Sequence, residues 1–155
     1  RFIHTRLGWN YRMTNMQAAI GLAQLEQLDK FIKNKRQMGA KYTDLFKELP
    51  CVQLPLESTD FADNIYWVYG LVLDESLGFD AEEAIKRLSK KGIGCRPFFY
   101  PMHQQPVLLN MGLFKGETYP VSEKLSQLGF YIPSGLSLTD DKIERVAEAV
   151  IEVLK

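Results

Sequence analysis

A short loop near the start of the chain combines residue types that suit anion binding. Residues 8–13 read Gly-Trp-Asn-Tyr-Arg-Met. The planar guanidinium of Arg12 matches phosphate or carboxylate oxygens, and the amide of Asn10 can donate hydrogen bonds to the same oxygens. The plainer interpretation is a helix-entry turn in which Trp9 and Tyr11 pack and Arg12 satisfies backbone carbonyls. The residue types alone favour that plainer interpretation.

A second group of candidate binding residues surrounds two prolines. The block that begins at Arg96 carries one guanidinium, three aromatic rings and one imidazole. Arg96 suits a carboxylate or phosphate, and an aromatic ring such as that of Tyr100 can flank a sugar or a base. His103 can bond a sugar hydroxyl or satisfy a backbone carbonyl, and its residue type alone favours the structural role. Phe98 and Phe99 fit a core or a pocket wall better than a recognition role.

Three further aromatic residues lie in the segment of residues 65–73. Tyr66, Trp67 and Tyr69 can be interpreted as a stacking surface for a nucleotide base. The segment is rich in β-branched and aromatic residues and has the length of a strand. Because the neighbouring residues are largely aliphatic, a buried strand is the favoured interpretation and the stacking surface is not.

The first loop leads directly into a predicted helix. Thr14 and Gln17 have the spacing of a capping box, in which two side chains satisfy unpaired backbone donors. Apolar residues then recur on one helical face, at Met16, Ala19, Ile20, Ala23, Leu28, Phe31 and Ile32. We expect a long helix from Asn15 to the mid-30s, with helical patterning that resumes through Phe46 and ends before Pro50.

The rest of the chain alternates predicted strands and helices. After an irregular connection at residues 51–63, the strands are expected at residues 65–73, 93–98 and 130–132. Boundaries of the predicted helices are marked by Asp80, Gly92, Pro120, Gly129 and Thr139. This alternation predicts a layered α/β unit in which helices pack against a small sheet.

Length and composition argue against several classes of protein. The chain has 155 residues, the size of one domain, and its 19 basic residues balance 19 acidic ones. This balance predicts no nucleic-acid partner, and no apolar run reaches the roughly 20 residues of a membrane helix. Cys51 and Cys95 stand apart without His at ligand spacing, which predicts no metal site and fits a reducing cytoplasm. Because the opening residues contain neither an initiator Met nor a signal core, we expect a C-terminal portion of a longer protein.

Three blocks of the sequence resemble, in the same order, a known enzyme family. The family is that of the sugar-nucleotide aminotransferases, named DegT/DnrJ/EryC1/StrS. The similar blocks are residues 8–13 running into 17–25, residues 96–106, and residues 119–126 followed by 132–134 and 138–139. Within the family, the first two blocks most resemble perosamine synthases, which use GDP-4-keto-6-deoxymannose.

The resemblance implies a fold and a division of the chain. Family members are fold-type-I pyridoxal-phosphate (PLP) enzymes. Residues 1–35 would therefore be the end of the cofactor domain, with an interface loop and a long linking helix, and residues 36–155 would be the small C-terminal domain. In the family the lysine that forms the Schiff base with PLP lies upstream of the first block. The chain is therefore expected to hold no catalytic residue and to be inactive alone.

The resemblance also implies site residues and partners. Asn10 would reach across the interface of a symmetric homodimer to the cofactor phosphate of the other subunit, a positioning role. The residues implied in substrate binding are Tyr11, Arg12, Arg96, Tyr100 and His103. The partners would be a nucleotide sugar and an amino-acid donor, with glutamate expected. Such enzymes are cytoplasmic and serve surface-polysaccharide synthesis, including that of O-antigen.

Two alternatives remain beside the aminotransferase. Some family members dehydrate the sugar and carry histidine in place of the PLP lysine, and the deciding position would lie upstream of this chain. The rival from another class is a stand-alone α/β domain that binds a protein or a small ligand and never held PLP.

Overall fold

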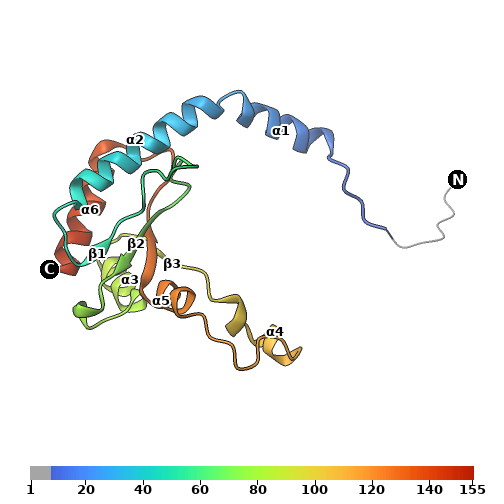
Figure 1. Ribbon diagram of the computed structural model, residues 1–155. Helices are drawn as coiled ribbons and strands as arrows, with labels where there is room; N and C mark the ends of the chain where they lie inside the picture. The colour runs from blue at the N-terminus through green and yellow to red at the C-terminus, as the bar shows by residue number, and fades with distance from the viewer. Residues whose placement is uncertain (1–7) are drawn as a thin grey trace, which may run out of the picture.

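A computed structural model describes residues 8–155, and the opening part of the predicted cofactor-domain segment, residues 1–7, lies outside the described residues. Figure 1 shows the elements in order along the chain. The helices are α1 (Asn15–Leu25), α2 (Leu28–Phe46), α3 (Ala81–Lys90), α4 (Pro106–Asn110), α5 (Pro120–Leu128) and α6 (Asp140–Leu154). The strands are β1 (Val52–Gln53), β2 (Tyr69–Leu73), β3 (Arg96–Pro97) and β4 (Gly129–Ile132), with 3-10 turns η1 (Glu75–Leu77) and η2 (Met102–Gln104).

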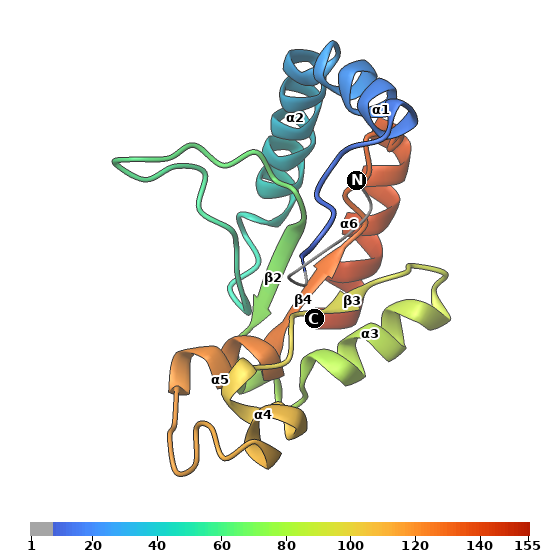
Figure 2. The ribbon, with the colours of Figure 1, turned by 90° about the vertical axis from the view of Figure 1, so that its right-hand side faces the viewer.

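The four strands form one antiparallel sheet in the order β1-β2-β4-β3. Helices α2, α3 and α6 pack on one face. Figure 2 looks onto the opposite face, where β2, β4 and β3 lie in front of α2 and α6. On this side α5 and the side chain of Phe98 approach the strands closely. The predicted layered α/β fold is confirmed, and its sheet has one covered and one largely open face.

Aromatic side chains dominate the core between α2 and the sheet. The ring of Tyr42 lies 5.0 Å from that of Tyr69 and 5.8 Å from that of Phe46, centroid to centroid. All three side chains are fully buried. The Tyr69 hydroxyl is 2.8 Å from the hydroxyl of Thr43, and the Tyr42 hydroxyl donates to the carbonyl of Pro133 at 3.0 Å. Burial of these rings with their polar ends satisfied fixes α2 on the sheet.

The predicted capping box is confirmed, but the single long helix is not. The N–H of Thr14 donates to the Gln17 side chain at 2.9 Å, and the Thr14 hydroxyl accepts from the Gln17 N–H. The chain then breaks between α1 and α2, where Gln27 has φ −106° and ψ 4°. The apolar face predicted for α1 is exposed rather than buried. Because nothing in the described residues packs on α1, no tertiary contact holds the two helices in one line.

Two predicted strands are shorter than expected. The strand predicted at residues 65–73 begins only at Tyr69, because Tyr66 has a φ of 50° that interrupts the extended backbone. The strand predicted at 93–98 is reduced to β3, in which Pro97 has no N–H to donate to a ladder. The connection at residues 51–63 is mostly irregular, as predicted, although it contributes β1 and an isolated bridge.

The remaining helix boundaries agree with their sequence signals. The Asp80 side chain accepts the Glu83 N–H at 3.0 Å and starts α3, and Gly92 follows its end with a φ of 76°. Pro120 opens α5 and Gly129 ends it. The last helix begins after Thr139 and buries the predicted apolar face against α2 and α3. Residues that cap the backbone groups at helix ends, which are visible in the sequence, thus predicted the bounds of these helices correctly.

Candidate functional site

A large hollow lies beside β3, between α3 and α5. Its volume is about 940 Å³, and both Arg96 and Tyr100 line it. Arg96 is exposed and sits opposite Tyr131 in the sheet, so the strand pairing presents it at the rim. The other lining residues include acidic, amide and aromatic side chains: Asp80, Glu82, Phe98, Phe99, Gln104, Glu123, Gln127 and Tyr131. This hollow brings two of the five predicted substrate-binding residues together.

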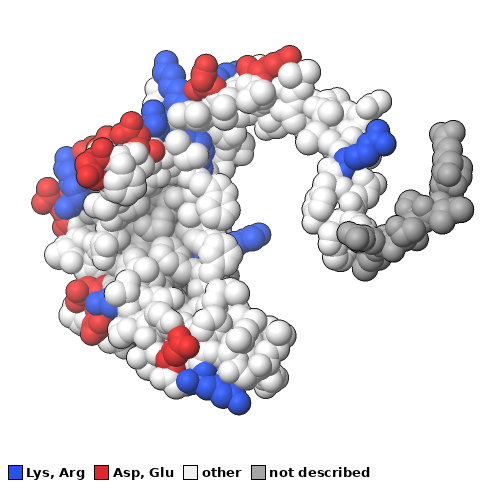
Figure 3. Space-filling view, turned by 45° about the vertical axis from the view of Figure 1, so that its right-hand side comes forward, with Lys and Arg blue, Asp and Glu red and all other residues white. Residues whose placement is uncertain are grey.

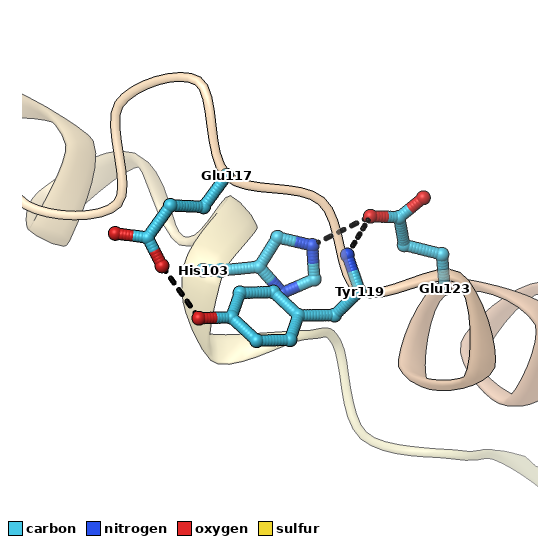
Figure 4. Close-up of polar contacts among 4 residues, drawn as sticks. All are labelled: His103, Glu117, Tyr119 and Glu123. Carbon is cyan, nitrogen blue, oxygen red and sulfur yellow. Dashed lines mark hydrogen bonds and ion pairs between the residues drawn. The ribbon is translucent and has the colours of Figure 1, made fainter.

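His103 is buried instead of lining the hollow. Its exposed fraction is 7%, and its Nε2 lies 2.8 Å from an oxygen of Glu123. Figure 4 shows the same carboxylate accepting the backbone N–H of Tyr119, at 2.9 Å, while the Tyr119 ring lies against the imidazole. The Tyr119 hydroxyl in turn donates to Glu117. The imidazole therefore joins η2 to the start of α5, and its predicted role in substrate binding stays a prediction.

Glu123 is the residue that ties this cluster together. The Tyr119 N–H, and then the His103 side chain, hold the pKa of the Glu123 carboxyl below its ordinary value. A carboxyl whose pKa is lower in the folded state than in the unfolded state stabilises the fold when the pH is above its unfolded-state pKa. This stabilisation is lost as the pH falls through its folded-state pKa. We expect the melting temperature of Glu123→Gln to fall less steeply than that of the unaltered protein below about pH 4.5.

Thermal melts of the full-length protein from neutral pH down to about pH 3 check this expectation. The matched control is Glu148→Gln, an exposed glutamate of α6, which should follow the unaltered protein. Identical slopes for Glu123→Gln and the unaltered protein would contradict the stabilising role of the carboxylate.

The predicted cofactor loop lies apart from this hollow. Figure 1 shows the segment before α1 set away from the sheet. The side-chain oxygen of Asn10 accepts the N–H of Arg12 at 3.0 Å, which forms a local turn. Tyr11 is 86% exposed, and Arg12 is exposed too. The structure thus does not bring Asn10, Tyr11 and Arg12 together with Arg96 and Tyr100.

Sequence reasoning missed the role of two residues. Lys35 of α2 donates from Nζ to the carbonyl of Trp67 at 3.0 Å and also to that of Ser134. Burial lowers the pKa of this amine. The prediction that Trp67 is buried in a strand is wrong, because its side chain is 69% exposed. No sequence signal marks Lys35, since its spacing on α2 is that of any exposed helical lysine.

The described part of the chain gives little support for a metal site, a reactive cysteine or a membrane-spanning helix. Within residues 8–155, no group of three or more His, Cys, Asp or Glu side chains is placed to hold a metal ion. Burial raises the pKa of the Cys95 thiol to about 12, so this thiol is protonated and unreactive at neutral pH. No described helix has the combination of length and apolar character needed to cross a membrane.

A family model matches the chain almost from end to end. Residues 1–151 fit the model described as the DegT/DnrJ/EryC1/StrS aminotransferase family. The chain belongs to this family. The resemblance carried by the three sequence blocks is therefore confirmed, and the DegT-family chain can be compared with characterised relatives.

The GDP-perosamine synthases are among the most similar relatives of this DegT-family chain. The chain is 34% identical to that of Vibrio cholerae over 97% of its length and 36% identical to that of Escherichia coli O157:H7 over 98%. It spans only about two fifths of each relative, 40% and 39%. Among solved structures, the aminotransferase TlmJ from Streptoalloteichus hindustanus superposes with a TM-score of 0.84 at 21% identity, over 99% of this chain and 40% of that one. This last likeness shows the shared fold.

Proposed function

We propose that the whole protein is a PLP-dependent aminotransferase that converts a keto group of a nucleotide-linked sugar into an amino group. The observation that carries the proposal is the family match over residues 1–151, together with the identity to GDP-perosamine synthases over nearly the whole chain. We propose GDP-4-keto-6-deoxymannose as the sugar substrate and glutamate as the amino donor. The enzyme would act in the cytoplasm, in the synthesis of a surface polysaccharide such as O-antigen.

Residues of the first loop fit the phosphate of PLP. The turn in which the side-chain Oδ1 of Asn10 accepts the Arg12 N–H orients the Asn10 amide, and the guanidinium of Arg12 is exposed. An amide N–H and a guanidinium are donors suited to a phosphate dianion. When bound, PLP supplies the electron sink that allows an amino group to move between donor and sugar. In our proposal Asn10 holds the phosphate of the cofactor in the other subunit of a homodimer.

The lysine that binds PLP is proposed to lie in the part of the protein that precedes this chain. Residues 1–35 would then belong to the cofactor domain and its linking helix, and residues 36–155 to the small domain. Arg96 and Tyr100 at the rim of the hollow would bind the sugar nucleotide, with Tyr11 and Arg12 contributed from the first loop. His103 would support this wall through its bond to Glu123.

The full-length protein, purified without added cofactor, tests the proposal. We expect visible absorbance from PLP bound to its lysine, abolished by borohydride reduction. Incubation with glutamate and GDP-4-keto-6-deoxymannose should yield 2-oxoglutarate and an amino sugar, identified by mass spectrometry. A dehydrated sugar product would assign the protein to the dehydratases of the family. A colourless protein that binds no PLP and leaves both substrates unchanged would favour a stand-alone binding domain.

A further inference from the structure

The backbone at Tyr66 adopts a conformation that L-residues rarely occupy. Its φ is 50°, in the left-handed region, where a bulky aromatic residue is strained. Such strain persists only where the surroundings determine the conformation, and it concentrates at sites of function. The residue whose direction this conformation sets is the next one, Trp67.

Buried contacts hold Tyr66 in this conformation. Its side chain is 3% exposed, and its ring stacks on that of Tyr69 with centroids 5.9 Å apart and planes 14° apart. The side chain of Asn64 accepts the Tyr66 N–H at 2.7 Å. On α2, Gly39 leaves the space that the ring fills, since a Cβ built there would lie 2.5 Å from ring atoms. The strained residue is therefore anchored on three sides.

The strain redirects Trp67 to the open face of the sheet. In a regular strand, Tyr66 and Tyr69 would point to opposite faces, because successive side chains alternate. Here both pack on the side of α2, and Trp67 between them is turned outward. The carbonyl of Trp67 is also held, since it accepts Nζ of Lys35 at 3.0 Å. The peptide is thus fixed on both sides while 69% of the side chain stays exposed.

Two hollows meet at this tryptophan. One, of about 320 Å³, is lined by Trp67 together with Phe99 and Tyr131. The second, of about 360 Å³, is lined by Trp67 together with Arg96 and Tyr131. We name the three rings Trp67, Phe99 and Tyr131 the aromatic shelf. Both volumes lie in the range of small-ligand sites, roughly 300–1,000 Å³.

Among the described residues, Arg96 is the one charged side chain that lines these two hollows, whereas the larger hollow that it also lines contains Asp80, Glu82 and Glu123. Across residues 8–155, no acidic side chain forms an ion pair with Arg96. Figure 3 shows Lys, Arg, Asp and Glu gathered along the outer helical side and a concave face that is mostly uncharged. A guanidinium at the edge of flat aromatic rings combines a stacking surface with a bidentate donor for phosphate.

From this geometry we infer that the aromatic shelf binds the base of the nucleotide, with Arg96 facing its diphosphate. The inference rests on the proposed function for the nucleotide class of the ligand. A base needs a flat ring to stack on, and the fixed peptide of Trp67 supplies one without ordering a loop upon binding. A bound apolar protein segment would not need the guanidinium beside the rings. A nucleoside diphosphate uses the rings for its base and the guanidinium for its phosphates.

The test compares Trp67→Ala with Trp67→Phe in the full-length protein. Binding of GDP and of inorganic diphosphate is measured by calorimetry, with KM and kcat for the nucleotide sugar. We expect Trp67→Ala to weaken GDP binding about tenfold or more and to raise KM similarly, because it removes a stacked base contact. Affinity for inorganic diphosphate and kcat should change little. Trp67→Phe should restore most of the GDP affinity.

The matched control is Phe61→Ala, which removes an 85% exposed aromatic side chain that lines neither hollow. It should leave GDP binding unchanged. Unaltered GDP affinity in Trp67→Ala would overturn the inference, as would an equal loss for GDP and inorganic diphosphate. Loss of PLP with GDP affinity intact would show that another part of the protein covers the shelf. If the protein holds no PLP but Trp67→Ala still weakens GDP binding, the proposed function fails and the base site stands.

Discussion

Replacing Asn10 by alanine in the full-length protein is expected to weaken PLP binding by about ten- to a hundredfold while the fold stays intact. The proposed contact is a hydrogen bond to a charged phosphate, and such bonds contribute about 1.5–3 kcal/mol. The change removes the amide and also the turn in which Asn10 accepts the Arg12 N–H. Cofactor dissociation is followed by the loss of visible absorbance on dilution.

Two further variants sharpen this expectation. Asn10→Asp keeps a side-chain oxygen for the turn but places a negative charge against the phosphate, so it should lose more affinity than the alanine variant. Asn110→Ala removes an exposed asparagine at the end of α4 and should retain the cofactor. Equal retention of PLP by all three variants would remove Asn10 from the proposed site.

Gly39→Ala should destabilise the packing of α2 on the sheet by about 1–3 kcal/mol, even though alanine is the better helix former. In an exposed helix, replacing glycine by alanine stabilises the helix by about 1 kcal/mol. At Gly39, however, the new Cβ would lie 2.5 Å from ring atoms of Tyr66 close to its attachment point. The ring is fully packed and cannot move without disturbing Tyr69 and the strained backbone, so overpacking outweighs the helix gain.

A second helical glycine supplies the control. Gly21 lies in α1, and no atom of the described residues comes within 4 Å of a Cβ built there. Gly21→Ala should therefore leave the stability of the core between α2 and the sheet unchanged. Hydrogen exchange of the buried amides of Tyr42 and Phe46 measures both effects as free energies of opening. Slower exchange in Gly39→Ala than in the unaltered protein would show that Tyr66 yields readily.

Elements with strong local signals were predicted well from the sequence. The start of α3 follows from the Asp80 side chain, and the bounds of α5 follow from a proline and a glycine. The buried face of α6 follows from its apolar period. Each of these signals is contained within one element, so no tertiary contact is needed to interpret it. The pairing of β2 with β4 joins residues about sixty positions apart and could not be derived in this way.

The site depended on contacts that sequence spacing does not reveal. An aromatic residue in an apolar run predicts burial for Trp67, and only the φ of Tyr66 shows that the chain turns it outward. His103 and Glu123 are twenty residues apart, and their bond arises because η2 folds back on α5. Lys35 is distinguished only by the two carbonyls it meets. Family resemblance named candidate residues, but these contacts arise from the tertiary structure.

The isolation of α1 has a consequence for how the protein assembles. This helix has 11 residues, none of them buried among the described residues, and its exposed apolar side chains include Met16, Ile20, Leu22 and Leu25. A helix of this length is marginal in water without packing. Its order must then come from whatever covers those side chains. If the second subunit of the proposed homodimer covers them, α1 should gain protection against hydrogen exchange late, with a dependence on protein concentration. In the proposed homodimer, the sheet with α2, α3 and α6 would fold first, and protection of α1 would then report assembly.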